Sequence, residues 1–271
     1  MITISKKEFD QLSAFIKANY GIYLKPEKET LVIGRLQNEL IQKGFKNFSE
    51  YYNYVIGDKT GMAVSGLLDK ITTNHTFFMR EADHFDYFKD VVLPYLNSVS
   101  RDKDLRIWCA GCSSGEEPYT LAMILDEYFG KDKLYWDTKV LATDISTKVL
   151  EEAKKGIYSN KEIETLPAKW RLNYTTKVNG EESVFIDRIR SEVIFRKFNL
   201  MENVFPFKKK FHVIFCRNVM IYFDNTTKNT LVNKYYDLLE PGGYLFIGHS
   251  ESINRDVSRF KYVQPAVYRK E

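Results

Sequence analysis

The sequence predicts an α/β fold: a mostly parallel sheet with helices on both faces, preceded by a small all-α region. Two observations predict it. Apolar residues recur at helical spacing through about the first 70 residues, and from Leu105 onward short apolar runs alternate with helical segments. With 271 residues, the chain is long enough for one large domain and a small one. A sheet of this kind binds its ligand at the carboxyl ends of its strands.

The pattern of apolar residues in the first region predicts a small helical bundle. Apolar residues between positions 9 and 16 recur at helical spacing before Gly21, and those between 31 and 41 repeat the pattern before Gly44. A third helix is expected to begin at the N-cap Ser49 and to end at Gly57. A fourth helix or connector begins near Leu67 and leads into a polar and aromatic stretch.

The alternation of apolar runs and helical segments in the remaining chain predicts the sheet and its helices. The expected order is strand 105–110, helix 118–129, strand 140–142, helix 146–155, strands 193–198 and 213–216, helix 225–239, a turn at 241–243 and strand 244–247. One piece interrupts this alternation. Two β-prone segments flank Asn179-Gly180, which is a strong hairpin turn signal. We therefore expect an inserted β-hairpin at about residues 168–192.

Composition narrows the classes of function. A hydrophobic fraction of 44% with 28% charged residues excludes a disordered chain, and no apolar run approaches the roughly 18 residues of a membrane span. The N-terminus shows no export signal, so a cytoplasmic protein without membrane insertion is expected. The net charge of +4 is small for a nucleic-acid-binding protein, and no such partner is expected.

The cysteines raise a metal or redox hypothesis that the sequence disfavours. Cys109 and Cys112 have the spacing of a redox pair or half of a zinc site, and Cys216 is the third cysteine of the chain. Neither Cys216 nor the scattered histidines supply a second pair at ligand spacing. We therefore expect no metal, and the three cysteines cannot form a disulfide framework.

A candidate ligand site lies between the first strand of the sheet and its helix. Residues 110–119 form a small-residue loop that lets the backbone approach a ligand closely, although a tight turn is the simpler interpretation. Glu116 and Glu117 open the helix, where the helix dipole alone would favour them. Asp144 ends the second strand, where a carboxylate can accept both hydroxyls of a ribose. The combination suits an adenosine ligand that carries a positive group and no phosphates, as S-adenosylmethionine does.

Several motifs then point to one family. The chain resembles the CheR family of chemotaxis receptor methyltransferases, and the segments that carry this resemblance, in the family's order, are Thr73–Glu81, Gly115–Tyr119, Ala142–Ile145, Cys216–Phe223 and Gly248–Ser252. The resemblance runs from about residue 8 to the C-terminus. It implies an N-terminal helical domain (1–75) joined to a Rossmann-like class I methyltransferase domain (76–271) that bears the inserted β-subdomain (168–192).

The resemblance also implies an activity and its residues. The family transfers a methyl group from S-adenosylmethionine to glutamate side-chain carboxylates of chemotaxis receptors, which forms γ-methyl esters, leaves S-adenosylhomocysteine and adjusts receptor signalling. The residues implied in cofactor binding are Asn74, Thr76, Arg80, Glu117, Asp144, Asn199, Leu200, Asn218 and Val219. Arg80 and Tyr222 are implied near the reacting centre. A structural ion pair of Arg80 with Glu81 or Asp83 is the alternative that residue spacing alone suggests.

The implied partner is the cytoplasmic helical region of methyl-accepting chemotaxis receptors, bound by a monomer. Arg35, Lys43 and Lys46 are the expected docking residues, with a solvated helix face as the alternative. Because Asn179-Gly180 is the only glycine turn of the insertion, we expect recognition that does not need a receptor-tail peptide. Two other functions stay open: a cofactor-sensing binding module, and a methyltransferase with a different substrate.

Overall fold

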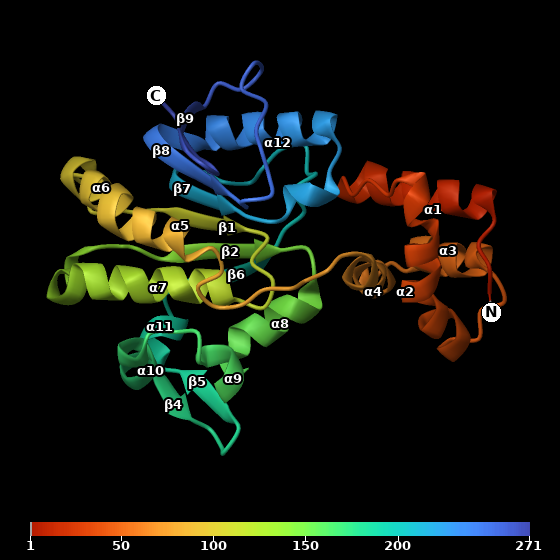
Figure 1. The fold of residues 1–271 in the computed structure, drawn as a ribbon, viewed down its shortest axis with the longest axis horizontal. Coiled ribbons are helices and arrows are strands. Elements are labelled where there is room, and N and C mark those ends of the chain that lie inside the picture. Colours follow the sequence, from red (N-terminus) through yellow and green to blue (C-terminus); the bar gives the residue numbers. More distant parts are fainter. Residues whose placement is uncertain (1) are drawn as a thin grey trace.

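The computed structural model describes residues 2–271 and has three parts (Figure 1). Helices α1 to α4 form one end of the molecule, a central sheet is flanked by further helices, and a small second sheet lies beside helices α9 to α11. No helix within the described residues is long and apolar enough to cross a membrane.

The N-terminal helices pack around a core of their own. Their bounds are α1 Lys6–Tyr20, α2 Glu29–Gln42, α3 Phe48–Gly57 and α4 Met62–Ile71, with a 3-10 turn (η1) at Pro26–Lys28. Ser5 and Glu8 form a capping box at the start of α1, and Gly21 ends it with a left-handed backbone. The expected N-cap Ser49 is wrong, because Asn47 accepts the hydrogen bond from the Glu50 N–H and α3 begins before Ser49.

The central sheet contains seven strands in the order β6-β2-β1-β7-β8-β10-β9. Their bounds are β1 Ile107–Ala110, β2 Val140–Asp144, β6 Val193–Lys197, β7 Phe211–Cys216, β8 Leu239–Ile247, β9 Lys261–Gln264 and β10 Val267–Arg269. The first five in this order are parallel, whereas β10 pairs antiparallel with both β8 and β9. The expected turn at 241–243 is wrong, because these residues lie inside β8, whose pairing with β7 shifts register between Phe211 and Val213.

Helices cover both faces of this sheet, as the alternating pattern predicts. The bounds of the remaining helices and helical turns are α5 Ala82–Tyr87, a π-helical turn (η2) Phe88–Val92, α6 Leu93–Val99, α7 Glu116–Phe129, η3 Gly130–Tyr135, α8 Thr147–Lys155, η4 Met220–Tyr222 and α12 Asn225–Leu238. Ile107 and Cys109 share a core with α5 to α8, and Trp108 and Ala110 share another with α12. The segment 82–99 was assigned no element from the sequence.

The inserted subdomain is larger than the expected hairpin. Its strands are β3 Ile157–Ser159, β4 Thr175–Lys177 and β5 Glu182–Phe185, in the order β3-β5-β4, and its helices are α9 Asn160–Ile163, α10 Ala168–Tyr174 and α11 Asp187–Arg190. The hairpin around Asn179-Gly180 is present as β4 and β5. The expected start at residue 168 misses β3, because a three-residue strand is too short to show a period in sequence.

The topology of the central sheet indicates a ligand-binding crevice at one of its edges. From β1 the chain adds β2 and then β6 on one side, and later crosses back to add β7 and β8 on the other side. The strand order therefore reverses between β1 and β7, and ligands of open α/β sheets bind at the carboxyl ends of strands at such a point.

Candidate functional site

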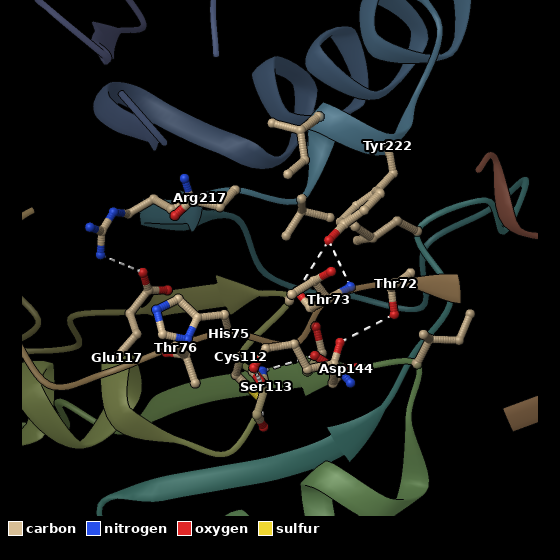
Figure 2. A pocket seen from close by; sticks show the side chains of 18 of the residues that line it. Thr72, Thr73, His75, Thr76, Cys112, Ser113, Glu117, Asp144, Arg217 and Tyr222 are labelled. Atoms are coloured by element: carbon tan, nitrogen blue, oxygen red, sulfur yellow. Dashed lines mark hydrogen bonds and ion pairs between the residues drawn. The ribbon is translucent and has the colours of Figure 1, made fainter. Parts of the chain in front are cut away.

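A cavity of about 390 Å³ opens at this edge, and every predicted cofactor residue lines it. Figure 2 labels Thr76, Glu117 and Asp144 among them. Its volume lies in the range of small-molecule sites. The predicted residues that line it are Asn74, Thr76, Arg80, Glu117, Asp144, Asn199, Leu200, Asn218, Val219 and Tyr222. Tyr20 and Ile22 also line the cavity, so the N-terminal helical region supplies part of its wall. The predicted residues alone are up to 148 positions apart in the sequence, and the fold brings them together here.

The loop between β1 and α7 forms one wall of the cavity. Gly111 has a φ of +103°, and a Cβ there would lie 2.3 Å from Cγ2 of Val219. The Ser113 N–H donates to Oδ2 of Asp144, and the Ser146 N–H donates to Oδ1, each at 2.9 Å. Asp144 is partly exposed toward the cavity, and burial raises the pKa of its carboxyl. The loop thus holds this carboxylate at the end of β2.

Glu117 lies on the cavity wall, and a buried arginine holds it there. Nη1 of Arg217 donates to Glu117 at 2.8 Å, and Nη2 donates to Glu81 at 3.0 Å and to the main-chain oxygen of Arg80. Burial raises the pKa of Glu117, and the charge and hydrogen bond of Arg217 oppose that rise. The pair of Glu117 and Arg217 is visible in Figure 2.

Arg80 is held by its own chain segment. Its Nη1 donates to the carbonyl of His75 at 2.7 Å, and its guanidinium carbon lies 5.9 Å from the ring centre of Phe77. Among the described residues the two carboxylates weighed as its ion-pair partners bind elsewhere, Glu81 to Arg217 and Asp83 to His249. The alternative interpretation, a structural ion pair of Arg80 with Glu81 or Asp83, is therefore wrong. Phe78, in the same segment, is buried and packs against Tyr158 and Phe185 of the subdomain.

Tyr222 connects the two parts of the chain. Its hydroxyl accepts a hydrogen bond from the Thr73 N–H at 2.9 Å and donates to the Thr73 carbonyl at 3.1 Å. The Tyr23 N–H donates to the Tyr222 carbonyl at 2.8 Å, and Lys17 forms an ion pair with Asp224 at 2.7 Å. These contacts clamp the segment after α4 onto the end of β7 and close one side of the cavity.

The loops after β6 and β7 form the remaining wall. Nδ2 of Asn199 donates to the main-chain oxygen of Asn19 at 2.8 Å. Asn218 has a φ of +59°, and its N–H donates to Glu251 at 2.9 Å. Glu251 also accepts from the N–H groups of Gly248 and Ile221 at 2.6 and 3.1 Å. The segment Gly248–Ser252 therefore contributes a buried carboxylate that fixes the loop carrying Asn218.

Comparison with known proteins assigns the family. Two family models match this chain: "CheR methyltransferase, SAM binding domain" over residues 74–269 and "CheR methyltransferase, all-alpha domain" over residues 7–72. The chain belongs to the CheR methyltransferase family. It is therefore an S-adenosylmethionine-binding methyltransferase of the class I α/β fold with an N-terminal all-α region, as the sequence predicts.

Relatives of the CheR chain agree with this assignment. It is 44% identical to the chemotaxis protein methyltransferase of Borreliella burgdorferi, over 99% of this chain and 96% of the relative. It is 35% identical to the chemotaxis protein methyltransferase of Escherichia coli, over 98% and 92%. An S-adenosylmethionine-dependent methyltransferase of Mesorhizobium loti is similar in structure, with 16% identity, a TM-score of 0.31 and coverage of 57% and 51%.

The cavity of this CheR chain fits S-adenosylmethionine by the chemistry of its lining. Gly111 leaves room where any side chain would meet Val219. Asp144 presents a carboxylate of the kind that accepts ribose hydroxyls, and Glu117 presents one suited to an ammonium group. Asp144 ends β2, whereas Glu117 lies in the first turn of α7, and this separation matches a ligand that carries a ribose and an amino group at separate places.

One cluster beside the cavity contains two histidines and a glutamate, side chains of the kind that bind metal ions. Among residues 2–271, ligand atoms of Glu81, His84 and His249 lie within 4.8 Å of one another. The oxygens of Glu81 already accept from Arg217, from Asn218 and from the His249 N–H. A cation would therefore have to share this carboxylate with a guanidinium, and we assign no metal to the cluster.

The expected docking residues have different surroundings in the CheR fold. Arg35 donates to the carbonyls of Lys70, Ile71 and Thr72 and to Oγ1 of Thr73, so its side chain caps the end of α4. The side chains of Lys43 and Lys46 are exposed, and Nζ of Lys43 lies 3.2 Å from the Tyr54 hydroxyl.

Sequence reasoning missed two residues of this site. Arg217 lies inside the motif Cys216–Phe223 but was assigned no role, and Glu81 was considered only as a partner of Arg80. A basic residue directly after a buried strand is the signal that could have identified Arg217, because such a residue needs a carboxylate partner.

Proposed function

We propose that this chain methylates glutamate side chains of chemotaxis receptors with S-adenosylmethionine, which forms glutamate γ-methyl esters. The observation that carries the proposal is the convergence of separate motifs: ten predicted side chains line a single cavity. The relatives named as chemotaxis protein methyltransferases support the receptor as the substrate.

The proposal gives the cavity residues defined tasks in binding. Asp144 binds the ribose hydroxyls, and Glu117 binds the amino group of the cofactor. Asn74 and Thr76 contact the cofactor from the segment after α4, and the loops after β6 and β7 contribute Asn199, Leu200, Asn218 and Val219. When bound, S-adenosylmethionine supplies an electrophilic methyl group on a sulfonium, and S-adenosylhomocysteine remains after transfer.

The acceptor needs little chemical activation. A glutamate carboxyl has an ordinary pKa near 4.3, so it is ionised at neutral pH and requires no general base. The protein must instead align the carboxylate and exclude water, effects that can contribute up to roughly 7–11 kcal/mol. Phe77, Val219, Tyr222 and Phe223 line the cavity and supply apolar surface for this purpose.

Arg80 orients a carboxylate at the reacting centre. The His75 carbonyl fixes one end of its guanidinium, and a guanidinium carries five N–H donors in a rigid fork. The remaining donors suit the carboxylate of the acceptor or that of the cofactor. Tyr222 positions the segment that carries these residues through its two hydrogen bonds to Thr73.

We further propose that the helical region contacts the receptor helices. Lys43 and Lys46 are the better candidates for this contact, because their side chains are exposed. Reversing the charge of Arg35 would also remove the cap of α4, so a loss of receptor methylation in that variant would not report docking alone.

The test is methylation of a receptor cytoplasmic fragment with labelled S-adenosylmethionine, followed by release of the label in base. Base-labile label marks an ester. We expect Arg80→Ala to abolish the labelling while its circular dichroism spectrum stays that of the parent, and Arg259→Ala, a surface arginine paired with Asp237, to keep full activity. Wild-type turnover in Arg80→Ala would refute the role of Arg80, and base-stable label would refute the ester.

A further inference from the structure

One buried guanidinium joins three separate parts of the site. Only 3% of the Arg217 side chain is exposed, and it follows directly on β7. Its donors reach Glu117 at the start of α7, and Glu81 and the Arg80 carbonyl in the segment before α5. Its guanidinium carbon lies 5.1 Å from the ring centre of Phe85, which covers one face of the group.

The backbone around Arg80 also depends on these bonds. Met79 and Glu81, on either side of Arg80, both have left-handed φ values of 60° and 54°. Such a conformation is unfavourable for residues other than glycine and persists where surrounding contacts enforce it. Arg217 supplies two of these contacts, one to the side chain of Glu81 and one to the main chain of Arg80.

We infer that Arg217 is a positioning residue that holds the Glu117 carboxylate in place for the amino group of the cofactor and holds Arg80 at the reacting centre. The inference rests on the proposed contact of Glu117 with that amino group. Arg217 itself acts through these two side chains. One residue would thus couple the cofactor end of the cavity to its acceptor end.

The electrostatic surroundings of Glu117 make this role measurable. Burial raises the pKa of Glu117, the neighbouring charge of Glu81 also raises it, and Arg217 is the cation that lowers it. The thiols of Cys109, Cys112 and Cys216 face the same region, and burial raises their pKa values well above the usual range. These thiols therefore stay neutral between pH 6 and 8.5.

Removal of the guanidinium should consequently make cofactor binding more dependent on pH than it is in the parent. Without Arg217 the pKa of Glu117 moves further up, so at a given pH a larger share of its carboxyl is protonated than in the parent. A protonated Glu117 binds an ammonium group poorly. Affinity for the cofactor should then fall as the pH falls, by at most tenfold per pH unit for a single proton.

The experiment measures binding of S-adenosylhomocysteine by calorimetry between pH 6 and 8.5. We expect Arg217→Met to bind roughly tenfold more weakly at pH 6.5 than at pH 8.5, and the parent should change less over this range. Arg217→Lys, which retains the positive charge, should show a smaller pH dependence. Arg106→Met is the matched control, because Arg106 also bridges two carboxylates, Asp104 and Glu240. Arg106 does not line the cavity, and its variant should retain the profile of the parent.

A double variant decides whether Glu117 carries the effect. In Glu117→Gln, binding should be weak and independent of pH, and adding Arg217→Met should introduce no pH dependence. A pH-dependent loss in this double variant would assign the effect to Glu81 and overturn the inference. A loss in Arg217→Met that is equal at all pH values would overturn it as well. Failure of the parent to bind the ligand would overturn the proposed function and this inference together.

Discussion

Neighbouring carboxylates at the start of α7 have different environments. Glu117 has Arg217 as its counter-charge. Glu116 is 4% exposed, and the Ser114 hydroxyl lies 2.9 Å from one of its oxygens and 3.0 Å from the other. Burial raises the pKa of Glu116 to about 7, an effect that its hydrogen bonds only partly offset. The burial of Glu116 therefore lowers the stability of the folded state near neutral pH, whereas the adjacent Glu117 lines the cavity.

Glu116→Gln should change how stability depends on pH. The folded pKa of about 7 exceeds the ordinary value of 4.5, so between pH 5 and 7 the folded state binds a proton that the unfolded state lacks. Its contribution to the free energy of unfolding is present at about pH 4.5 and is lost as the pH rises to about 7, a loss of roughly 3 kcal/mol. Above that pH both states are ionised, and this slope ends.

Urea denaturation of the parent and of Glu116→Gln at pH 5, 6, 7 and 8 measures this effect. The variant should lose the decrease between pH 5 and 7 and exceed the parent in stability at pH 8. Glu151→Gln, at an exposed position of α8, serves as the control and should follow the parent. Identical pH profiles for the parent and Glu116→Gln would contradict the prediction.

The resemblance to the CheR family named the cavity residues, and the fold class explains why they lie close together. Asp144 ends β2, Asn199 follows β6 and Asn218 follows β7, and the carboxyl ends of parallel strands meet at one edge of the sheet. Arg217 received no role because its partners lie 100 and 136 positions away. Ion pairs between such distant residues have no periodic signature in sequence.

At the scale of elements, apolar period and glycine position predicted most of the fold. The strands β1, β2, β6 and β7 and the helices between them lie where buried runs and helical spacing indicate. The segment 82–99 was missed although Phe85, Phe88, Val92 and Leu96 have helical spacing, so that signal was available. The three-residue strand β3 could not be predicted from the sequence, because its pairing with β5 depends on contacts across the subdomain.

The loop between β1 and α7 gives a prediction at this scale. Gly111→Ala places a Cβ 2.3 Å from Val219 and strains a backbone φ of +103°. The left-handed backbone costs roughly 1–2 kcal/mol of stability. Because the new Cβ would displace Val219, which lines the cavity, we expect S-adenosylhomocysteine to bind at least about tenfold more weakly. Binding is measured by calorimetry.

The matched control for this loop is Gly44→Ala. Gly44 also has a positive φ, of +75°, but a Cβ there meets nothing within 4 Å, and the residue does not line the cavity. It should lose stability through backbone strain and retain the affinity of the parent. Unchanged affinity in Gly111→Ala would show that the loop tolerates a side chain against Val219.

For the whole molecule, the cavity belongs to two parts of the chain at once. Tyr20 and Ile22 from the helical region line it together with the strand ends of the sheet. Tyr222 links the same two parts through its hydrogen bonds to Thr73 and Tyr23. A ligand that fills the cavity therefore contacts both parts, and its binding energy opposes their separation.

Hydrogen exchange should reveal this coupling. At a ligand concentration of 100 times Kd, binding stabilises the bound state by about 2.7 kcal/mol, so amides that exchange when the two parts separate should slow by about 100-fold. The Thr73 N–H and the Tyr23 N–H, both bonded to Tyr222, are the amides to follow with S-adenosylhomocysteine. The Val178 N–H, bonded to Glu182 in the hairpin, should exchange at an unchanged rate. Slowing confined to residues of the sheet would mean that the ligand does not bind the helical region, and the wall formed by Tyr20 and Ile22 would then have no part in binding.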